Sequence, residues 1–160
     1  MGRMVAKRLK RPFMDVDETI EKKEGRRISD IFQKEGEVHF RALEKKAIRD
    51  LAGKRGLVFA TGGGAILDPG NRKLLKKIGF VIALLAKPGT IFKRVQRSRR
   101  RPLLEGKDKL LEIKRLLKIR GPYYRQADMC VETDGCTARQ AARRVLQRLM
   151  ESGEWNKTTG

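Results

Sequence analysis

Short, unbroken apolar runs alternate along this chain with longer stretches in which apolar residues recur every three or four positions. The first pattern is typical of strands buried in a parallel sheet, and the second of amphipathic helices. Their regular alternation predicts an α/β fold with three αβα layers, in which helices cover both faces of a central parallel sheet. We expect strands at 12–16, 56–61, 80–86 and 129–133, and helices at 3–10, across 17–52, at 69–78, at 90–98, around 108–119 and between Thr137 and Gly153.

One of these strands is followed by three consecutive glycines, which have no side chains. Residues 57–60 form the apolar run LVFA, typical of a strand buried on both faces, and Thr61 is followed by Gly62, Gly63 and Gly64. Glycines can take positive φ and let a ligand approach main-chain N–H groups closely. Open α/β sheets bind ligands at the carboxyl ends of their strands. A tight turn from strand to helix would also use one or two glycines, so both interpretations stay open.

The charge balance points to anionic partners. The chain has 39 Lys and Arg against 19 Asp and Glu, a formal net charge of +20. Such an excess favours nucleic acid, membrane surfaces or phosphorylated small molecules. No cluster of aromatic residues lies among the basic runs, so a base-stacking platform for nucleic acid is not expected. Much of the excess fits a solvated basic surface, including the face of the last helix that carries Arg139, Arg143, Arg144 and Arg148.

Length and apolar content are those of one ordinary domain. The 160 residues predict a single domain over 1–152 and a flexible tail at 153–160. The longest apolar run, 80–86, is far too short to span a membrane. Cys130 and Cys136 are six positions apart, which fits neither a redox pair nor a zinc site. We therefore interpret them as reduced thiols in a cytoplasmic protein.

Two carboxylates stand at the end of the first expected strand. Asp15 and Asp17 flank Val16, so their side chains should emerge close together where ligands bind in such folds. One could contact a hard cation and the other could act as a base. The competing interpretation is that Asp17 only caps the helix that begins at Glu18.

Arginines are the other candidates for chemistry. Arg41 and Glu44 are one helical turn apart, a spacing that by itself is more typical of a surface ion pair than of a site. Basic residues at 97–101 border a segment with Pro102 and Gly106, a composition that predicts a loop able to close over phosphates. Arg120 stands two residues before Pro122.

Five motifs in register resemble the shikimate kinase family. They are DVDETIE at 15–21, GEVHFRALE at 36–44, ATGGG at 60–64, RPLL at 101–104 and RGPYY at 120–124. Each motif is weak alone, but their order and spacing together are specific. The resemblance extends from Gly2 to about Met150.

The resemblance implies a kinase of the P-loop fold type that transfers the ATP γ-phosphoryl group to the 3-hydroxyl of shikimate, in aromatic amino-acid biosynthesis. It implies ATP and Mg²⁺ as cofactors and shikimate and ATP as partners. We expect no membrane partner, no nucleic acid and a monomer. Substrate-binding helices would cover about 17–52 and a lid about 99–112. The implied roles are base and substrate binding for Asp17, Mg²⁺ for Asp15, the substrate carboxylate for Arg41 and Arg120, substrate contacts for Gly62, Gly63 and Gly64, the transferring phosphate for Arg101, and the adenine region for Arg97 and Cys136.

One family feature has no counterpart in the 160 residues. Family members carry a first strand and a G-x-x-x-x-G-K-S/T loop that cradles the phosphates, whereas Gly2 and Arg3 match residues beyond that loop. We expect a gap between strands 12–16/56–61 and strands 80–86/129–133, a start site placed too late, and little or no kinase activity from these residues alone. Restoring roughly 15 to 20 upstream residues, one strand and the loop, should restore shikimate-dependent ADP release.

Two alternative functions stay open at this point. Another small-molecule or nucleoside monophosphate kinase would share the architecture, although the aspartate pair, Arg41, the glycines and Arg120 together favour a carboxylated polyol as substrate. A basic, non-catalytic binding module without a phosphate loop is the third hypothesis. Salt-sensitive binding to random DNA, without a response to shikimate, would favour that module.

Overall fold

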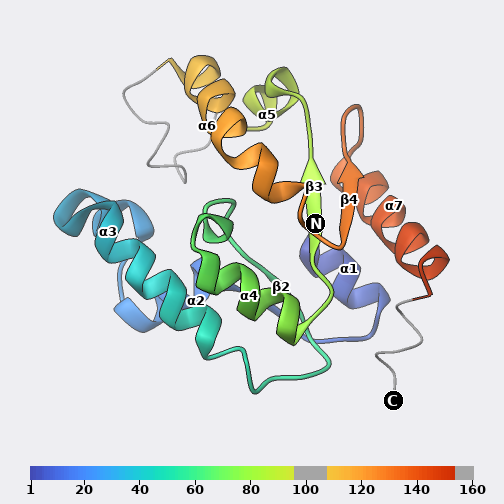
Figure 1. The fold of residues 1–160 in the computed structure, drawn as a ribbon, viewed down its shortest axis with the longest axis horizontal. Helices are drawn as coiled ribbons and strands as arrows, with labels where there is room; N and C mark the ends of the chain where they lie inside the picture. Colours follow the sequence, from blue (N-terminus) through green and yellow to red (C-terminus); the bar gives the residue numbers. More distant parts are fainter. Residues whose placement is uncertain (96–107, 154–160) are drawn as a thin grey trace.

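The computed structural model describes residues 1–95 and 108–153. Helices surround short parallel strands (Figure 1), which confirms the predicted α/β class. Within the described residues, no helix combines the length and apolar character that a membrane span requires. The elements are α1 (Gly2–Arg8), β1 (Phe13–Asp15), α2 (Val16–Glu24), α3 (Ile28–Arg49), β2 (Val58–Ala60), the 3₁₀ helix η1 (Ala65–Leu67), α4 (Pro69–Ile78), β3 (Ile82–Leu85), α5 (Pro88–Val95), α6 (Lys109–Tyr124), β4 (Met129–Glu132) and α7 (Ala138–Glu151).

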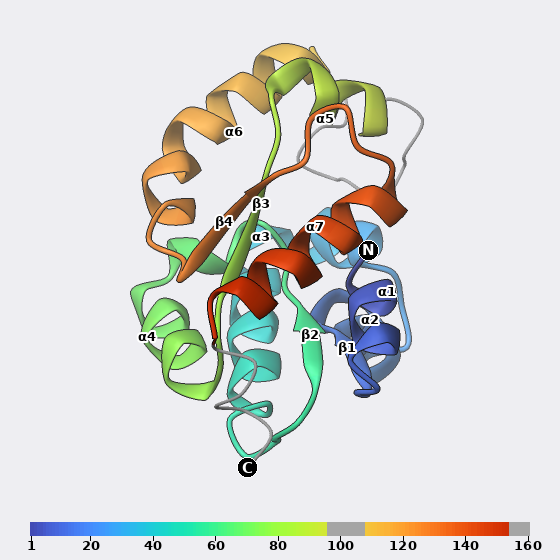
Figure 2. The same ribbon diagram turned by 90° about the vertical axis from the view of Figure 1, so that its right-hand side faces the viewer.

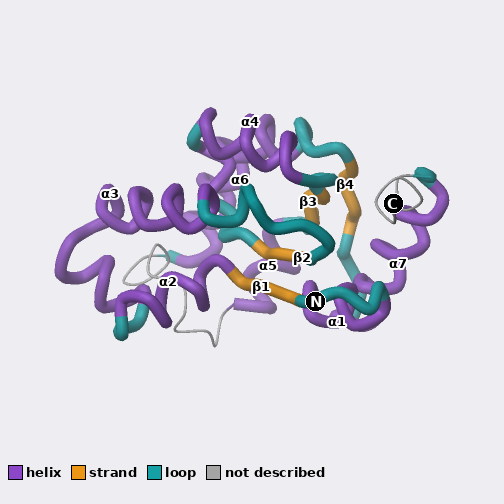
Figure 3. Tube along the Cα trace, turned by 90° about the horizontal axis from the view of Figure 1, so that it is seen from below, coloured by secondary structure: helices purple, strands orange, loops and turns teal. Residues whose placement is uncertain are grey.

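The strands form two separate parallel pairs. In one pair β1 lies beside β2, with Phe13 opposite Val58, and in the other β3 lies beside β4, with Ile82 opposite Met129. Among the described residues no hydrogen-bonded ladder joins β2 to β3, and Figure 3 shows the two pairs apart, as the predicted gap requires. Every residue of β2 is only half-buried. The prediction that this strand is buried on both faces was therefore wrong; among the described residues β1 is the only strand that pairs with β2.

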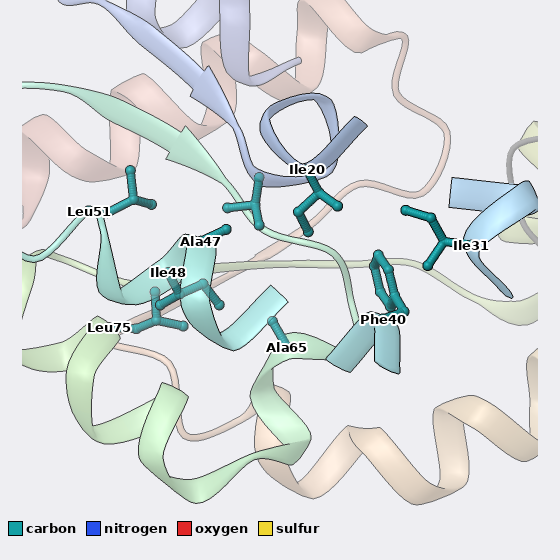
Figure 4. Close-up of a cluster of buried hydrophobic side chains, with 9 residues drawn as sticks. Ile20, Ile31, Phe40, Ala47, Ile48, Leu51, Ala65 and Leu75 are labelled. Atoms are coloured by element: carbon teal, nitrogen blue, oxygen red, sulfur yellow. The ribbon is translucent and has the colours of Figure 1, made fainter. Parts of the chain in front are cut away.

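Each strand pair has its own apolar core. We call β1, β2, α2, α3, η1 and α4 the first half, and β3, β4, α5, α6 and α7 the second half. Figure 4 shows the core of the first half, in which Ile20, Ile48 and Leu75 come together from α2, α3 and α4. The second half is built on Val131 and the apolar face of α7, and Val5 of α1 packs into it. Since α1 also contacts β1 and β2, it connects the two halves (Figure 2).

The helix α6 is longer than the sequence predicts. We expected it around 108–119. Proline lacks the N–H group that continues a helix, and its ring clashes with the preceding turn, so Pro122 disfavours a longer helix. In the structure α6 contains Pro122 and ends only at Tyr124. Arg120 and Tyr124 are thus four residues apart on one helix, which places both side chains on the same face.

Two arginines of α7 cover the outer edge of β4. Arg144 donates to the carbonyl oxygen of Glu132 and Arg148 to that of Cys130, both over 2.7 Å. Val131, the residue between Cys130 and Glu132, directs its backbone groups toward β3. Both arginines are exposed, as the interpretation of a solvated surface predicts, and they hydrogen-bond the strand edge as well. Their guanidinium groups form hydrogen bonds with backbone carbonyl groups that a free strand edge would otherwise expose to another chain.

Candidate active site

A cavity of about 190 Å³ with a mixed apolar and polar lining lies beyond the carboxyl ends of β1 and β2. One wall is apolar and comes from both halves, with Phe32 and Phe40 on α3 facing Ile113 and Leu117 on α6. The remainder of the lining is polar or backbone. It consists of Asp17, Arg41, Glu44, Gly62, Gly63, Gly64, Arg120 and Tyr124. The structure thus brings together every residue that the resemblance assigns to substrate binding.

The two aspartates after β1 have different surroundings. Asp15 is the N-cap of α2, and its Oδ1 accepts hydrogen bonds from the backbone N–H groups of Asp17 (3.0 Å) and Glu18 (3.4 Å). Because α2 begins at Val16, Asp17 lies in the first turn of the helix and lines the cavity. The competing interpretation of Asp17 as the helix cap is wrong.

Half-buried Arg41 forms an ion pair with fully buried Glu44. Arg41 donates to Glu44 Oε2 over 2.8 Å, and its other terminal nitrogen donates to Glu37 over 2.9 Å. Glu44 is only 1% exposed, so the interpretation of a surface ion pair is wrong. A break at Gly36 (φ 80°) divides α3, and the residues after it form the helical segment that carries Arg41 and Glu44. Glu44 Oε1 has no hydrogen-bond partner among the described residues.

The glycine turn, Gly62–Gly64, is required for space and not for unusual dihedral angles. None of the three has positive φ, contrary to one part of the prediction. A Cβ on Gly62 would lie 3.2 Å from Glu44 Oε1, and a Cβ on Gly64 would lie 2.6 Å from Arg41 Cζ. Cβ atoms would therefore take the space that the site side chains occupy.

Arg120 approaches the same turn from the second half. It is buried at 9% exposure, and its Nε has no hydrogen-bond partner within the described part of the chain. Its Nη1 lies 3.7 Å from the position that a Cβ on Gly63 would take. Buried guanidinium nitrogens are normally paired. An unpaired one beside a cavity is suited to an anionic ligand such as a carboxylate.

The Glu44 carboxyl is electrostatically strained. Burial raises the pKa of Glu44 above its ordinary value; the ion pair with Arg41 opposes the shift, the charge of Asp17 adds to it, and Arg120 opposes it. The folded protein therefore holds this proton more tightly than the unfolded chain does. The contribution of Glu44 to the free energy of unfolding therefore falls as pH rises from the ordinary pKa of glutamate, about 4.3, through its raised pKa in the folded protein.

Substituting Glu44→Gln should remove that pH dependence. The difference in unfolding free energy between variant and wild type should shift in favour of the variant as pH rises through this window, which urea denaturation at a series of pH values would measure. Glu37→Gln is the matched control, because it removes a carboxylate from the exposed side of the same guanidinium. Parallel pH profiles for Glu44→Gln and the wild type would contradict the assignment of this strain to Glu44.

Of the residues assigned to the nucleotide, Cys136 is the one that the structure describes. Cys136 is outside the cavity lining, on the loop after β4, where its carbonyl oxygen accepts a hydrogen bond from Arg94 (3.2 Å). Arg94 also donates to Thr133 Oγ1 (2.9 Å), which connects α5 to this loop. Arg97, Arg101 and most of the expected lid lie outside the described residues.

Besides the apolar wall, two polar lining residues were not predicted as part of the site. Glu44 was assigned to the surface, although its spacing from Arg41 would have placed it in the site had the buried face of α3 been identified. Tyr124 was missed because α6 was expected to end before Pro122. Its hydroxyl donates to the carbonyl oxygen of Gly63 over 2.8 Å.

Parallel strands flanked by helices, with a cavity at the carboxyl ends of β1 and β2, define an α/β protein, and the similar solved structures are kinases that act on a small molecule. The family described as shikimate kinase matches residues 1–150. The chain is 42% identical to the shikimate kinase of Thermodesulfovibrio yellowstonii, over 92% of this chain and 85% of that protein. It is 41% identical to the shikimate kinase of Thermus thermophilus, over 96% and 84%.

Solved structures agree with this match. The shikimate kinase of Acinetobacter baumannii, solved in complex with shikimate, superimposes with a TM-score of 0.90 at 41% identity, over 94% of this chain and 85% of that one. The Aquifex aeolicus shikimate kinase gives a TM-score of 0.78 at 32% identity, over 99% and 90%. This chain belongs to the shikimate kinase family. Family membership favours the first of the three functional hypotheses.

Proposed function

We propose that this protein phosphorylates shikimate at a ring hydroxyl, with ATP as the phosphoryl donor, in the cytoplasm. The observation that carries the proposal is the convergence of Arg41 and Arg120, one from each half, on the glycine turn beside Asp17. Guanidinium groups suit a carboxylate, and carboxylates and backbone groups suit hydroxyls. A small hydroxylated acid matches this set of partners better than a nucleoside monophosphate does.

The residues of the cavity would have different roles, according to their chemistry. Arg120 and Arg41 would hold the substrate carboxylate, and the glycine turn would contact a ring hydroxyl. Asp17 would accept the proton of the attacking hydroxyl as its oxygen bonds to the γ-phosphorus and ADP leaves. The apolar wall formed by Phe32, Ile113 and Leu117 would limit the access of water to the transferring phosphate.

The fit of the chain to Mg²⁺ rests on one carboxylate. Among the described residues, no three acidic, histidine or cysteine side chains gather into a metal site. Asp15 uses Oδ1 to cap α2, which fixes its carboxylate near Asp17. Mg²⁺ is commonly held by one or two carboxylates with phosphate oxygens and water. Asp15 would therefore contribute to the ion only together with the nucleotide, where the ion would neutralise phosphate charge.

Binding and activity assays test the proposal. Calorimetry on the 160-residue chain should detect shikimate binding and a large loss of affinity for the methyl ester, which lacks the carboxylate. A coupled ADP-release assay on the natural-length gene product should show shikimate-dependent turnover. If neither preparation responds to shikimate, the proposal is wrong.

Gly64→Ala should weaken shikimate binding without unfolding the protein. The new Cβ would displace the guanidinium of Arg41, which is the flexible end of a side chain, so the backbone need not move. Losing a charge-assisted hydrogen bond corresponds to roughly a 10- to 100-fold loss of affinity. Calorimetry and thermal unfolding would measure both effects. Gly79→Ala is the control, since no atom lies within 4 Å of a Cβ there, and equal affinities for the two variants would contradict the role of Arg41.

A further inference from the structure

Two consecutive tyrosines at the end of α6 are connected to the two ends of the segment that follows β2, Tyr124 directly and Tyr123 through Arg72. The Tyr124 hydroxyl donates to the carbonyl oxygen of Gly63 over 2.8 Å. The Tyr123 ring lies under the guanidinium of Arg72, with Cζ 4.6 Å from the ring centroid. Arg72 in turn donates to the carbonyl oxygens of Ile66 (2.6 Å) and Leu67 (3.1 Å). The segment from Gly63 to Leu67 is thus held at both ends by one turn of α6.

These contacts cross the boundary between the two halves. Asp17, Arg41 and Glu44 belong to the first half, whereas Arg120 belongs to the second. Besides the sheet, contacts between α6 and the segment that follows β2 can fix the distance between these two groups of side chains at the cavity.

Tyr124 is placed to do so. It is one helical turn after Arg120, and a Cβ on Gly63 would lie 2.9 Å from its hydroxyl oxygen and 3.7 Å from Arg120 Nη1. Its carbonyl oxygen also accepts a weak hydrogen bond from Cys130 Sγ of β4 over 3.5 Å. Because a trans peptide is rigid, anchoring the Gly63 carbonyl also orients the N–H group of Gly64.

We propose that Tyr124 is a positioning residue for the shikimate site, whose hydroxyl holds the glycine turn in register with Arg120 across the two halves. Tyr123, through Arg72, holds the far end of the same segment. This inference rests on the proposed function. It adds that the substrate affinity of this site depends on a side chain that need not touch the substrate.

The test compares two matched deletions of a hydroxyl group, Tyr124→Phe and Tyr123→Phe. Tyr123→Phe keeps the aromatic face under Arg72. In the natural-length gene product, Tyr124→Phe should raise the KM for shikimate by about 3- to 10-fold, the worth of one neutral hydrogen bond. The KM for ATP and kcat should stay within about twofold, and Tyr123→Phe should resemble the wild type in all three constants.

Three outcomes would overturn the inference. An unchanged KM for shikimate in Tyr124→Phe would show that the turn keeps its place without the hydroxyl. Parallel changes in both KM values and kcat would point to a general loss of structure. Failure of the wild type itself to use or bind shikimate would overturn the proposed function and this inference together, whereas the first two outcomes leave the proposed function intact.

Discussion

Replacing Arg120 with methionine is expected to weaken shikimate binding by roughly 30-fold or more, since the loss of a buried partner for a charged group costs about 2 kcal/mol or more. The same variant should unfold at an equal or higher temperature. Arg120 is buried with its Nε unpaired, and a buried guanidinium nitrogen without a hydrogen-bond partner is costly to remove from water. Methionine has a similar length and no such cost. Calorimetry with shikimate and thermal unfolding of the ligand-free chain measure the two effects.

Weaker shikimate binding together with an equal or higher unfolding temperature would identify Arg120 as a binding residue. A structural arginine would lose stability on substitution, whereas a residue kept for its ligand gives up affinity and gains stability. Arg125→Met is the matched control, because Arg125 is exposed at the C-cap of the same helix. If Arg120→Met binds shikimate within about threefold of the wild type, the assignment of Arg120 to the substrate carboxylate is wrong.

Much of the fold could be predicted from local patterns. The helix at 69–78 was predicted to the residue, because Asp68 caps it and Pro69 begins it. The strand at 129–133 was also close, since β4 covers Met129–Glu132. The length of α6 was not predictable in this way. Packing against the glycine turn stabilises its last turn beyond Pro122, and packing of this kind joins residues far apart in the sequence.

The site was predictable only in part, for a similar reason. The resemblance identified Asp17, Arg41 and Arg120, and all three line one cavity. Glu44 was missed because an i, i+3 ion pair has the same spacing on an exposed face as on a buried one. The reason for the three glycines was also missed. Their backbone dihedral angles are ordinary, and the need for glycine comes from side chains of α3 and α6 that pack against the turn.

Asp17→Asn should leave shikimate bound but largely stop phosphoryl transfer. An amide can still hydrogen-bond a substrate hydroxyl, so the dissociation constant should change by less than about tenfold. It cannot take up the proton of the attacking hydroxyl, and loss of a positioned base lowers kcat by roughly 100- to 10,000-fold. Steady-state kinetics on the natural-length gene product, together with calorimetry on the same preparation, separate the two effects.

The neighbouring substitution Asp15→Asn shows whether the loss comes from the base or from the local charge. Asparagine is as good an N-cap as aspartate, so α2 should remain intact. The variant removes one negative charge at the carboxyl end of β1 but leaves Asp17 in the cavity. Its activity should recover as the Mg²⁺ concentration is raised, because the carboxylate contributes only to binding of the ion. Asp17→Asn should not recover at any Mg²⁺ concentration. If it retains kcat within about threefold of the wild type, another group takes the proton.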